Sequence, residues 1–229
     1  MKTLFLNPNS NDAITKTLRR QIAAQGLPPA SFEVRQLAGA PKIIGSLQDN
    51  MKAQRIFKKN YKQLTQGFTR LVMMSSLDTG FDAARDVGVI EVYGFTRSVL
   101  AWHRSQAQQL QAITFDSSMT PLYQALFAIK ENQGVVLHIS TLPLAPGEVE
   151  SAWDAVLNSL RKVCRELTDT SSAPIFIVGA VGLELGEALR QEGFHQVIDP
   201  VANLIAHLQS TASSIKAQSV SHPLKSGSK

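Results

Sequence analysis

The sequence predicts an α/β protein with two similar flavodoxin-like halves, each a parallel sheet of about four strands flanked by helices, and a cleft between the halves. Short apolar runs alternate with helical segments along the chain, which is typical of parallel sheets. Runs such as Ile175–Val178 are apolar throughout, as in strands covered on both faces. The 229 residues, 44% of them hydrophobic, suffice for a large core.

The first half is predicted from apolar periodicity and from capping residues. Asn11 can cap a helix in which Ile14, Leu18 and Ile22 recur every four positions, and Gly26 ends that helix. The expected elements are a strand at 4–6, a helix at 12–25, a strand at 32–37, a helix at 47–66, a strand at 71–74, a helix at 81–87 and a strand at 89–93.

The second half is predicted to repeat this plan. Pro121 opens one helix at its favoured first turn, Gly134 stops it, and Pro146–Glu148 starts another helix. The expected elements are a helix at 96–108, a strand at 110–115, the helix from 121, a strand at 135–139, a helix from 146 to 167, a strand at 175–178, a helix at 183–191, a strand at 197–198 and a helix at 201–208. We expect residues 1–95 plus 200–209 to form the first half, 96–199 the second half, and 210–229 a disordered Ser/Lys-rich tail.

Composition excludes several classes of protein. Net charge is +5, but three lysines lie in the last twenty residues, and the remaining 20 basic and 18 acidic residues give no nucleic-acid surface. No apolar run has the ~20 residues of a membrane span, and the N-terminus does not resemble a signal peptide. We therefore expect a cytoplasmic protein with no nucleic-acid or membrane partner, which could form a homo-oligomer.

The chain has one cysteine, Cys164, within a predicted helix. A single thiol excludes an intrachain disulfide and a cysteine-rich metal site. The expected role of Cys164 is that of a small buried or half-buried helix residue, and not of a nucleophile. We expect no cofactor and no metal.

A basic cluster lies on the predicted helix at 47–66. It contains Lys52, Arg55, Lys58, Lys59 and Lys62. These side chains are interpreted as a solvated helix face, with a phosphate-binding patch as the alternative.

The carboxyl ends of the predicted strands carry small and polar residues. These ends are at 7–10, 39–41, 75–76, 115–118, 140–141 and 179–182. In open α/β sheets ligands bind beyond these ends, and free backbone N–H groups at helix starts can hold a carboxylate. The pattern predicts a site for a small anionic or polar ligand, and it predicts no reaction.

Several segments, in order, resemble the Asp/Glu/hydantoin racemase family. The opening Leu-Phe-Leu-Asn-Pro-Asn-Ser at 4–10 resembles the family's first strand and its Asn-Pro-Asn turn. Asp-Thr-Gly-Phe-Asp-Ala-Ala-Arg at 78–85 resembles its Asp-Pro-Gly-Leu-Asp-Ala-Ala-Arg. Residues 175–183 resemble the strand and turn that carry its second cysteine, and 197–200 resemble its Val-Ile-Asp-Gly. The resemblance covers roughly residues 3–208.

The resemblance implies cofactor-free racemisation by two thiols, one removing a proton and one donating it from the opposite face. The matching positions here are Ser75 and Ala180, so it implies that two-thiol chemistry is lost. Ser75 is the candidate for any remaining proton transfer. The candidate ligand-binding residues are Asn7, Asn9, Ser76, Thr114, Gly179, Ala180 and Val181.

Three functions remain open from the sequence. The first is a racemase-family protein that binds a small carboxylate, amino-acid or hydantoin-like ligand without two-thiol chemistry. The second is a cofactor-independent isomerase or racemase with altered chemistry. The third is a Ser75-dependent hydrolase, for which His138, near the end of a predicted strand, is the candidate base and a packed core residue is the alternative role of that histidine.

Overall fold

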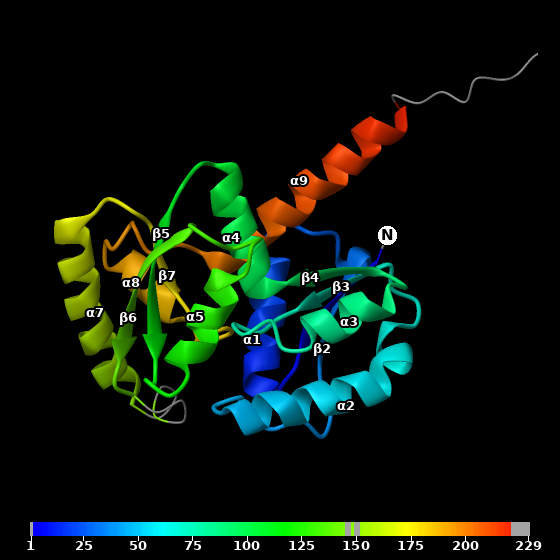
Figure 1. Cartoon of the computed structure of the whole chain (residues 1–229), viewed down its shortest axis with the longest axis horizontal. Coiled ribbons are helices and arrows are strands. Elements are labelled where there is room, and N and C mark those ends of the chain that lie inside the picture. The colour runs from blue at the N-terminus through cyan, green and yellow to red at the C-terminus, as the bar shows by residue number, and fades with distance from the viewer. Residues whose placement is uncertain (1, 145–147, 149–151, 221–229) are drawn as a thin grey trace, which may run out of the picture.

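The computed structural model describes residues 2–144, 148 and 152–220, with side chains up to 213. It contains two parallel sheets with helices packed around them (Figure 1). In Figure 1 the first sheet lies on the right, the second lies on the left, and the last helix extends away from the body. The predicted class, an α/β fold with two flavodoxin-like halves, is confirmed.

The first sheet has four strands in the order β2-β1-β3-β4, all parallel. They are β1 (Thr3–Asn7), β2 (Phe32–Gln36), β3 (Arg70–Met73) and β4 (Glu91–Gly94). The connecting helices are α1 (Asp12–Ala23), the short 3-10 helix η1 (Pro29–Ser31), α2 (Leu47–Thr65) and α3 (Phe81–Val87). The predicted cap is present, because the side chain of Asn11 accepts hydrogen bonds from the N–H groups of Ala13 and Ile14.

The second sheet has three strands in the order β6-β5-β7. They are β5 (Leu110–Phe115), β6 (Val136–Leu142) and β7 (Ile175–Ile177). The predicted strand at 197–198 is reduced to a single parallel bridge between Val197 and Ile175. If Val197 is counted as a fourth strand beside β7, the two sheets have equivalent strand orders. The second sheet therefore differs from the predicted four strands only at this element.

The remaining helices follow β4. They are α4 (Phe95–Ser105), α5 (Thr120–Ala128), α7 (Trp153–Thr170), α8 (Leu185–Gln191) and α9 (Pro200–Val220), and most of their ends differ from the predicted ones. The predicted helix start at 146–147 lies outside the described residues. The predicted tail boundary at Ser210 falls inside α9, and 221–229 lie outside the described residues.

One hydrophobic cluster spans both halves and joins them. It includes Phe5 and Val72 from the first sheet, Phe95 from α4, Phe176 from the second sheet and Leu204 from α9. All five side chains are at most 1% exposed. Because α9 packs on both α4 and α1, the last helix ties the two halves together. The division of the chain at 95 and 200 stays a prediction.

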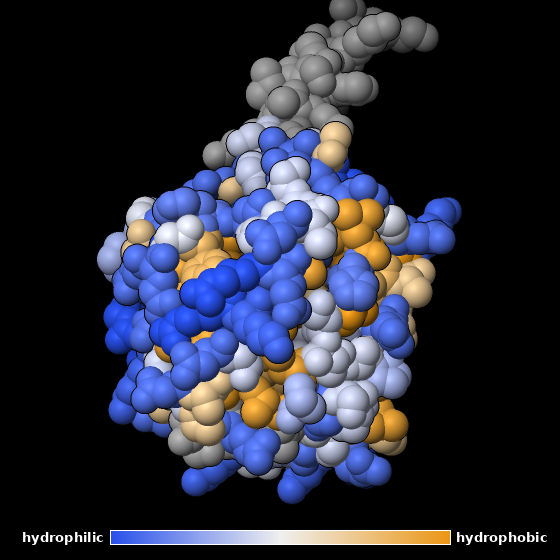
Figure 2. All heavy atoms as spheres, turned by 90° about the vertical axis from the view of Figure 1, so that its left-hand side faces the viewer, coloured by the Kyte–Doolittle hydropathy of each residue, from blue (hydrophilic) through white to orange (hydrophobic). Residues whose placement is uncertain are grey.

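The outer helix of the second half is amphipathic. α7 buries Leu160 and Cys164 against the second sheet, so the predicted burial of the lone thiol is confirmed. Burial raises the pKa of Cys164 to about 11. Figure 2 shows this side of the molecule as mostly hydrophilic, with smaller hydrophobic areas between. Within the described ranges, no helix combines the length and apolar character that a membrane span requires.

Candidate functional site

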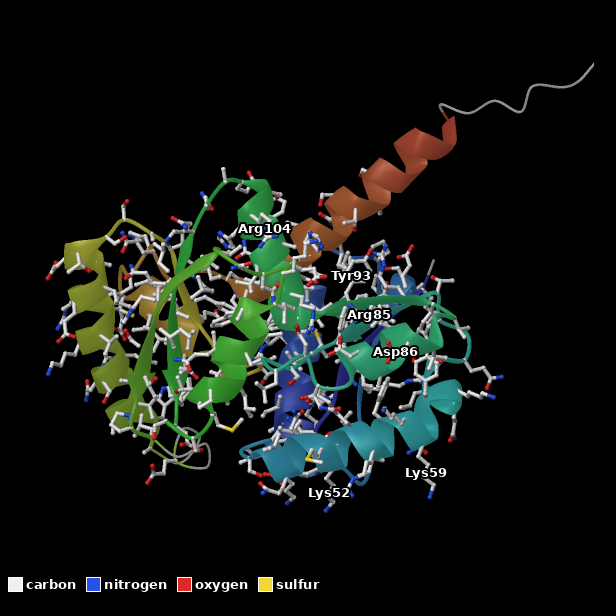
Figure 3. The ribbon with its side chains drawn as sticks, in the orientation of Figure 1. Lys52, Lys59, Arg85, Asp86, Tyr93 and Arg104 are labelled. Carbon is white, nitrogen blue, oxygen red and sulfur yellow. The ribbon has the colours of Figure 1, made fainter. Side chains whose placement is uncertain are left out.

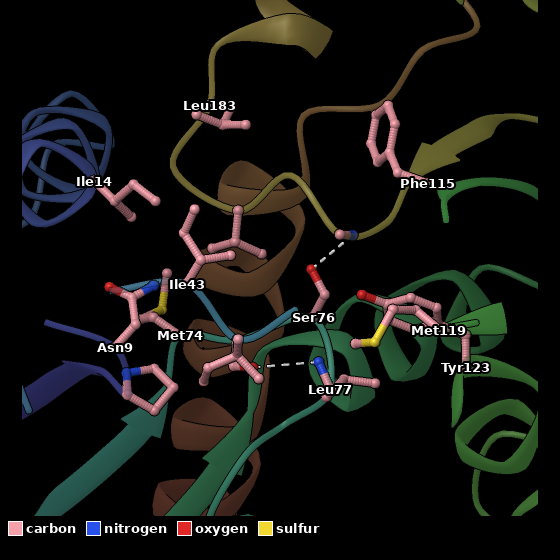
Figure 4. A pocket seen from close by; sticks show the side chains of 15 residues that line it. Asn9, Ile14, Ile43, Met74, Ser76, Leu77, Phe115, Met119, Tyr123 and Leu183 are labelled. Carbon is pink, nitrogen blue, oxygen red and sulfur yellow. Dashed lines mark hydrogen bonds between the residues drawn. The ribbon is translucent and has the colours of Figure 1, made fainter. Parts of the chain in front are cut away.

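A pocket of about 100 Å³ lies between the halves, at the carboxyl ends of β1, β3, β5 and β7. This is where parallel sheets place their ligands. Figure 4 shows the side chains that converge there. Its lining residues are Pro8, Asn9, Ile14, Ile43, Ile44, Met74, Ser75, Ser76, Leu77, Phe115, Met119, Tyr123, Gly179, Val181 and Leu183. None of these described lining residues is an aspartate, glutamate, lysine, arginine, histidine or cysteine.

Asn9 enters the pocket on a rigid turn after β1. The buried Asn7 donates from Nδ2 to Asn9 Oδ1 (2.8 Å) and to Thr15 Oγ1 (3.0 Å). The N–H of Asn11 also donates to Asn9 Oδ1 (2.9 Å). Because Oδ1 accepts both bonds, the Nδ2 group of Asn9 is the part that can donate to a ligand. Asn7 therefore positions Asn9 and does not itself line the pocket.

Ser76 joins the two halves at the base of the pocket. Its Oγ accepts a hydrogen bond from the N–H of Gly179 (2.9 Å), as Figure 4 shows, and its carbonyl accepts one from Thr96 Oγ1 (2.7 Å). A residue that follows β3 is thereby fixed to the turn that follows β7 and to the first turn of α4. Tyr123, a buried side chain of α5, lines the same pocket.

Tyr123 supplies a neutral hydroxyl to the pocket. It is 4% exposed, and burial raises the pKa of its phenol above the ordinary value, with the nearby Ser76 side chain opposing that shift. Tyr123 makes none of the hydrogen bonds found among the described side chains, so its phenol hydrogen can be donated to a ligand. Sequence reasoning missed Tyr123, although it lies in the first turns of a helix that follows a predicted strand end.

Ser75 also lines the pocket, and neither hydrogen-bond partner of its hydroxyl is a base. Its Oγ lies 3.0 Å from Thr79 Oγ1 and accepts a weaker bond from the N–H of Leu77 (3.3 Å). His138 is exposed on β6, where it pairs in register with Gln111. Gln111 is near the start of β5, whereas the pocket is at Phe115, the other end. The suggested His138–Ser75 pair is therefore wrong, and so is the packed core role of His138.

Three predicted ligand contacts do not line this pocket. Asn7 and Thr114 are fully enclosed beneath it, at 1% and 0% exposure. Ala180 lies on the other side of its turn and lines a second hollow against α1 and α8. Gly179 and Val181 do line the pocket. Side chains of successive turn residues point in different directions, and the sequence alone does not show which of them point into the pocket.

The segment that carries Ser75 and Ser76 is anchored by Asp78. Its fully buried carboxylate accepts hydrogen bonds from the N–H groups of Thr96 (2.8 Å) and Arg97 (3.1 Å), in the first turn of α4, and from Arg97 Nη1 (3.1 Å). Arg97 is held in place by the ring of Phe81, 4.2 Å away. Asp78 therefore caps the start of α4, and not α3, the helix that follows it directly in the chain.

Burial raises the pKa of Asp78 from 3.8 to about 6, while Arg97 and the two backbone N–H groups oppose the shift. The folded protein therefore binds a proton at a higher pH than the unfolded chain does. The contribution of Asp78 to stability is present in full below pH 4 and is lost as pH rises through 6. This contribution amounts to about 2–3 kcal/mol.

We expect Asp78→Asn to remove this dependence. Urea unfolding of both proteins at pH 4.5 and pH 7.5 measures it, because the difference between wild type and variant isolates Asp78 from other titrating groups. The difference in free energy of unfolding, wild type minus variant, should become more positive as pH falls from 7.5 to 4.5. Parallel pH profiles would show that Asp78 does not titrate in this range.

Over residues 2–144, 148 and 152–220, no group of three or more histidine, cysteine, aspartate or glutamate side chains is placed to hold a metal ion. The chemical groups that the pocket offers are amide, hydroxyl and backbone N–H donors on an apolar wall.

Fold and site together define a class: two-half parallel α/β proteins with a pocket between the carboxyl ends of their strands. The sequence matches the Asp/Glu/hydantoin racemase family over residues 4–208, and the chain belongs to that family. A search of curated protein sequences gives no match.

Solved structures show the same fold at low sequence identity. Allantoin racemase from Klebsiella pneumoniae is 17% identical with a TM-score of 0.75, covering 93% of this chain and 88% of that one. Allantoin racemase from Pseudomonas fluorescens is 18% identical with a TM-score of 0.73, covering 93% and 91%. Glutamate racemase from Thermus thermophilus is 17% identical with a TM-score of 0.57, covering 97% and 83%.

Proposed function

We propose that the protein binds a small carboxylate, amino-acid-like or hydantoin-like ligand in the pocket between its halves, without two-thiol racemisation. The observation that carries this proposal is the pocket itself, which a racemase-family fold surrounds with hydrogen-bond donors and no thiol. The one cysteine, Cys164, is 0% exposed in the core of the second half. Two-sided proton exchange needs two accessible acid–base groups, and this chain cannot supply them as thiols.

The lining supports a ligand that carries no ammonium group. A buried ammonium needs a carboxylate or several acceptors, and no acidic side chain is among the described lining residues. A carbonyl or carboxylate oxygen can instead accept from Asn9 Nδ2 and Tyr123 O–H. The apolar part of the ligand would contact Ile43, Met74 and Met119. Within the proposed group, hydantoin-like rings and simple carboxylates with an apolar substituent fit better than zwitterionic amino acids.

Thermal unfolding with a ligand panel tests the proposal. The panel contains 5-alkyl hydantoins, aliphatic carboxylates, 2-hydroxy acids and the matching amino acids. A bound ligand at about 100 times its Kd adds about 2.7 kcal/mol of stability, which raises the Tm by roughly 5–10 °C in a chain of this size. If no member of the panel raises the Tm, the binding proposal fails.

Incubation of the same ligands in deuterated water tests the reaction. We expect no enzymatic incorporation of deuterium next to the carbonyl carbon. Incorporation would favour the alternative, an isomerase with altered chemistry, with Ser75 and Tyr123 as the side chains that reach the pocket.

Tyr123→Phe is expected to weaken binding of any ligand found in this screen by about three- to tenfold, because one neutral hydrogen bond is lost. The ring and its packing are kept, so the Tm of the free protein should change little. Isothermal titration measures the affinity. The control is Tyr93→Phe, whose hydroxyl bonds Thr211 outside the pocket (3.3 Å) and which should leave the affinity unchanged. Equal affinities of Tyr123→Phe and wild type would remove Tyr123 from the site.

The hydrolase alternative predicts covalent labelling at Ser75. Because Ser75 Oγ contacts Thr79 and no base, we expect a serine-reactive phosphonate to label wild type and Ser75→Ala equally and slowly. Intact-mass spectrometry reads the labelling. Fast labelling that disappears in Ser75→Ala would support a hydrolase.

A further inference from the structure

The outer face of α2 carries a dense group of cations. We call it the basic stripe, and it consists of Lys52, Arg55, Lys58, Lys59 and Lys62. All five side chains are exposed. In Figure 3, Lys52 and Lys59 point away from the body of the molecule. The stripe has no part in the pocket described above.

Helical geometry places the five cations on one side of α2. At about 100° per residue, they fall within an arc of about 120°. The buried residues Ala53, Phe57 and Tyr61 occupy the opposite side and pack into the first half. From Lys52 to Lys62 the stripe is about 15 Å long.

No acidic partner neutralises the stripe within the described residues. The sequence has no aspartate or glutamate between Asp49 and Asp78. None of the ion pairs among the described side chains includes a stripe residue. Like charges three and four positions apart each destabilise a helix by about 0.2–0.5 kcal/mol. The positive side chains of the stripe therefore repel one another, and an anionic group bound over them would remove this repulsion.

Two exposed apolar side chains extend the same arc toward the N-terminus of α2. Leu47 is 50% exposed and Met51 is 52% exposed. On the neighbouring α3, Asp82, Arg85 and Asp86 are exposed, and Arg85 pairs with Asp82 (3.2 Å), so α3 adds no net positive charge beside the stripe. The surface is a narrow track with an apolar end and a basic end.

We propose that this face of α2 is a docking surface for an acidic amphipathic helix of a partner protein. A helix presents carboxylates at the three- and four-residue spacing of the stripe, and its width of about 10 Å matches one helix face. Apolar residues at one end of that helix would cover Leu47 and Met51. A membrane or a nucleic-acid duplex is broader than the stripe and would bring its charge near Asp82 and Asp86.

Fluorescence anisotropy with the full-length protein tests this surface. The probe is a labelled helical peptide of about 20 residues, with glutamates at three- and four-residue spacing and two leucines at one end. We expect binding that weakens as salt is raised. Arg55→Gln/Lys59→Gln should weaken it about five- to thirtyfold, because two exposed ion pairs are lost.

The matched control is Lys162→Gln/Arg165→Gln, which removes the same charge from the exposed side of α7. It should bind the peptide as the wild type does. If both double variants weakened peptide binding equally, the weakening would come from the lower net charge of the protein and not from the stripe, and the proposal would be overturned. Tighter binding, at the same salt, to phosphatidylserine vesicles or to a DNA duplex than to the peptide would also overturn it. Absence of peptide binding would overturn it as well.

Discussion

Gly94→Ala is expected to lower the free energy of unfolding by about 3–5 kcal/mol. A Cβ at Gly94 would lie 2.4 Å from the Asp78 carboxyl carbon and 2.5 Å from its Oδ2. Asp78 cannot move aside without breaking its bonds to Thr96 and Arg97, and a buried charge would then lose its partners. Urea unfolding at pH 7 measures the change.

Gly186→Ala is the control for this prediction. Gly186 lies in α8, and its added Cβ would meet no atom closer than 3.4 Å. Alanine should stabilise the helix by about 0.5 kcal/mol. A Gly94→Ala protein as stable as the wild type would show that Asp78 is not held where the structure places it.

Gly182→Ala is expected to cost about 2–5 kcal/mol and to abolish ligand binding. Gly182 has a φ of +79°, which costs an alanine about 1–2 kcal/mol. Its Cβ would also lie 2.6 Å from Ile14 Cγ2, and such overpacking adds about 1–3 kcal/mol. Because Ile14, Val181 and Leu183 all line the pocket, pushing the turn off α1 distorts the pocket wall.

Two further variants separate backbone strain from steric overlap. Gly193 has a φ of +96° and nothing within 4 Å of its Cβ position, so Gly193→Ala measures strain alone. Ile14→Ala removes the clashing methyl group, so the double variant with Gly182→Ala should lose less stability than the two single changes added together. Additive losses would show that the turn and α1 are not in contact.

The sequence predicted the part of the site that depends on strand ends. Asn9, Ser75 and Ser76 follow predicted strands, and the structure places all three in the pocket wall. The rule works because parallel strands bring their carboxyl ends to one edge of each sheet. It cannot tell which residues of a turn point inward. For this reason Gly179, Ala180 and Val181 were all predicted to bind the ligand, whereas only Gly179 and Val181 line the pocket.

The apolar walls were not predicted. Ile14 and Tyr123 come from helices, Met119 directly precedes α5, and Ile43 comes from a loop, so none of them lies at a predicted strand end. Periodicity assigns such side chains to a core, since a pocket wall and a core contact look alike in a sequence. The anchor of the site was missed for a similar reason. Asp78 lies three residues before α3, whereas its hydrogen-bond partners, Thr96 and Arg97, lie in the first turn of α4.

Order of elements was easier to predict than their ends. The four strands of the first sheet were all expected, because β1 and β3 contain short apolar runs, β2 alternates apolar and polar residues, and β4 overlaps the mixed segment 89–93 that was predicted as a strand. The run Val197–Ile198 is too short to distinguish a strand from a bridge, and the structure has the bridge. The Ser-rich composition after 210 suggested disorder, yet α9 continues to Val220.

The burial of Cys164 bears on how the protein would respond to oxidants. A sulfur with no exposed surface and with a pKa of about 11 offers peroxide or an alkylating reagent almost no reactive thiolate at neutral pH. Oxidative stress, which inactivates enzymes that rely on accessible thiolates, should therefore leave this pocket intact.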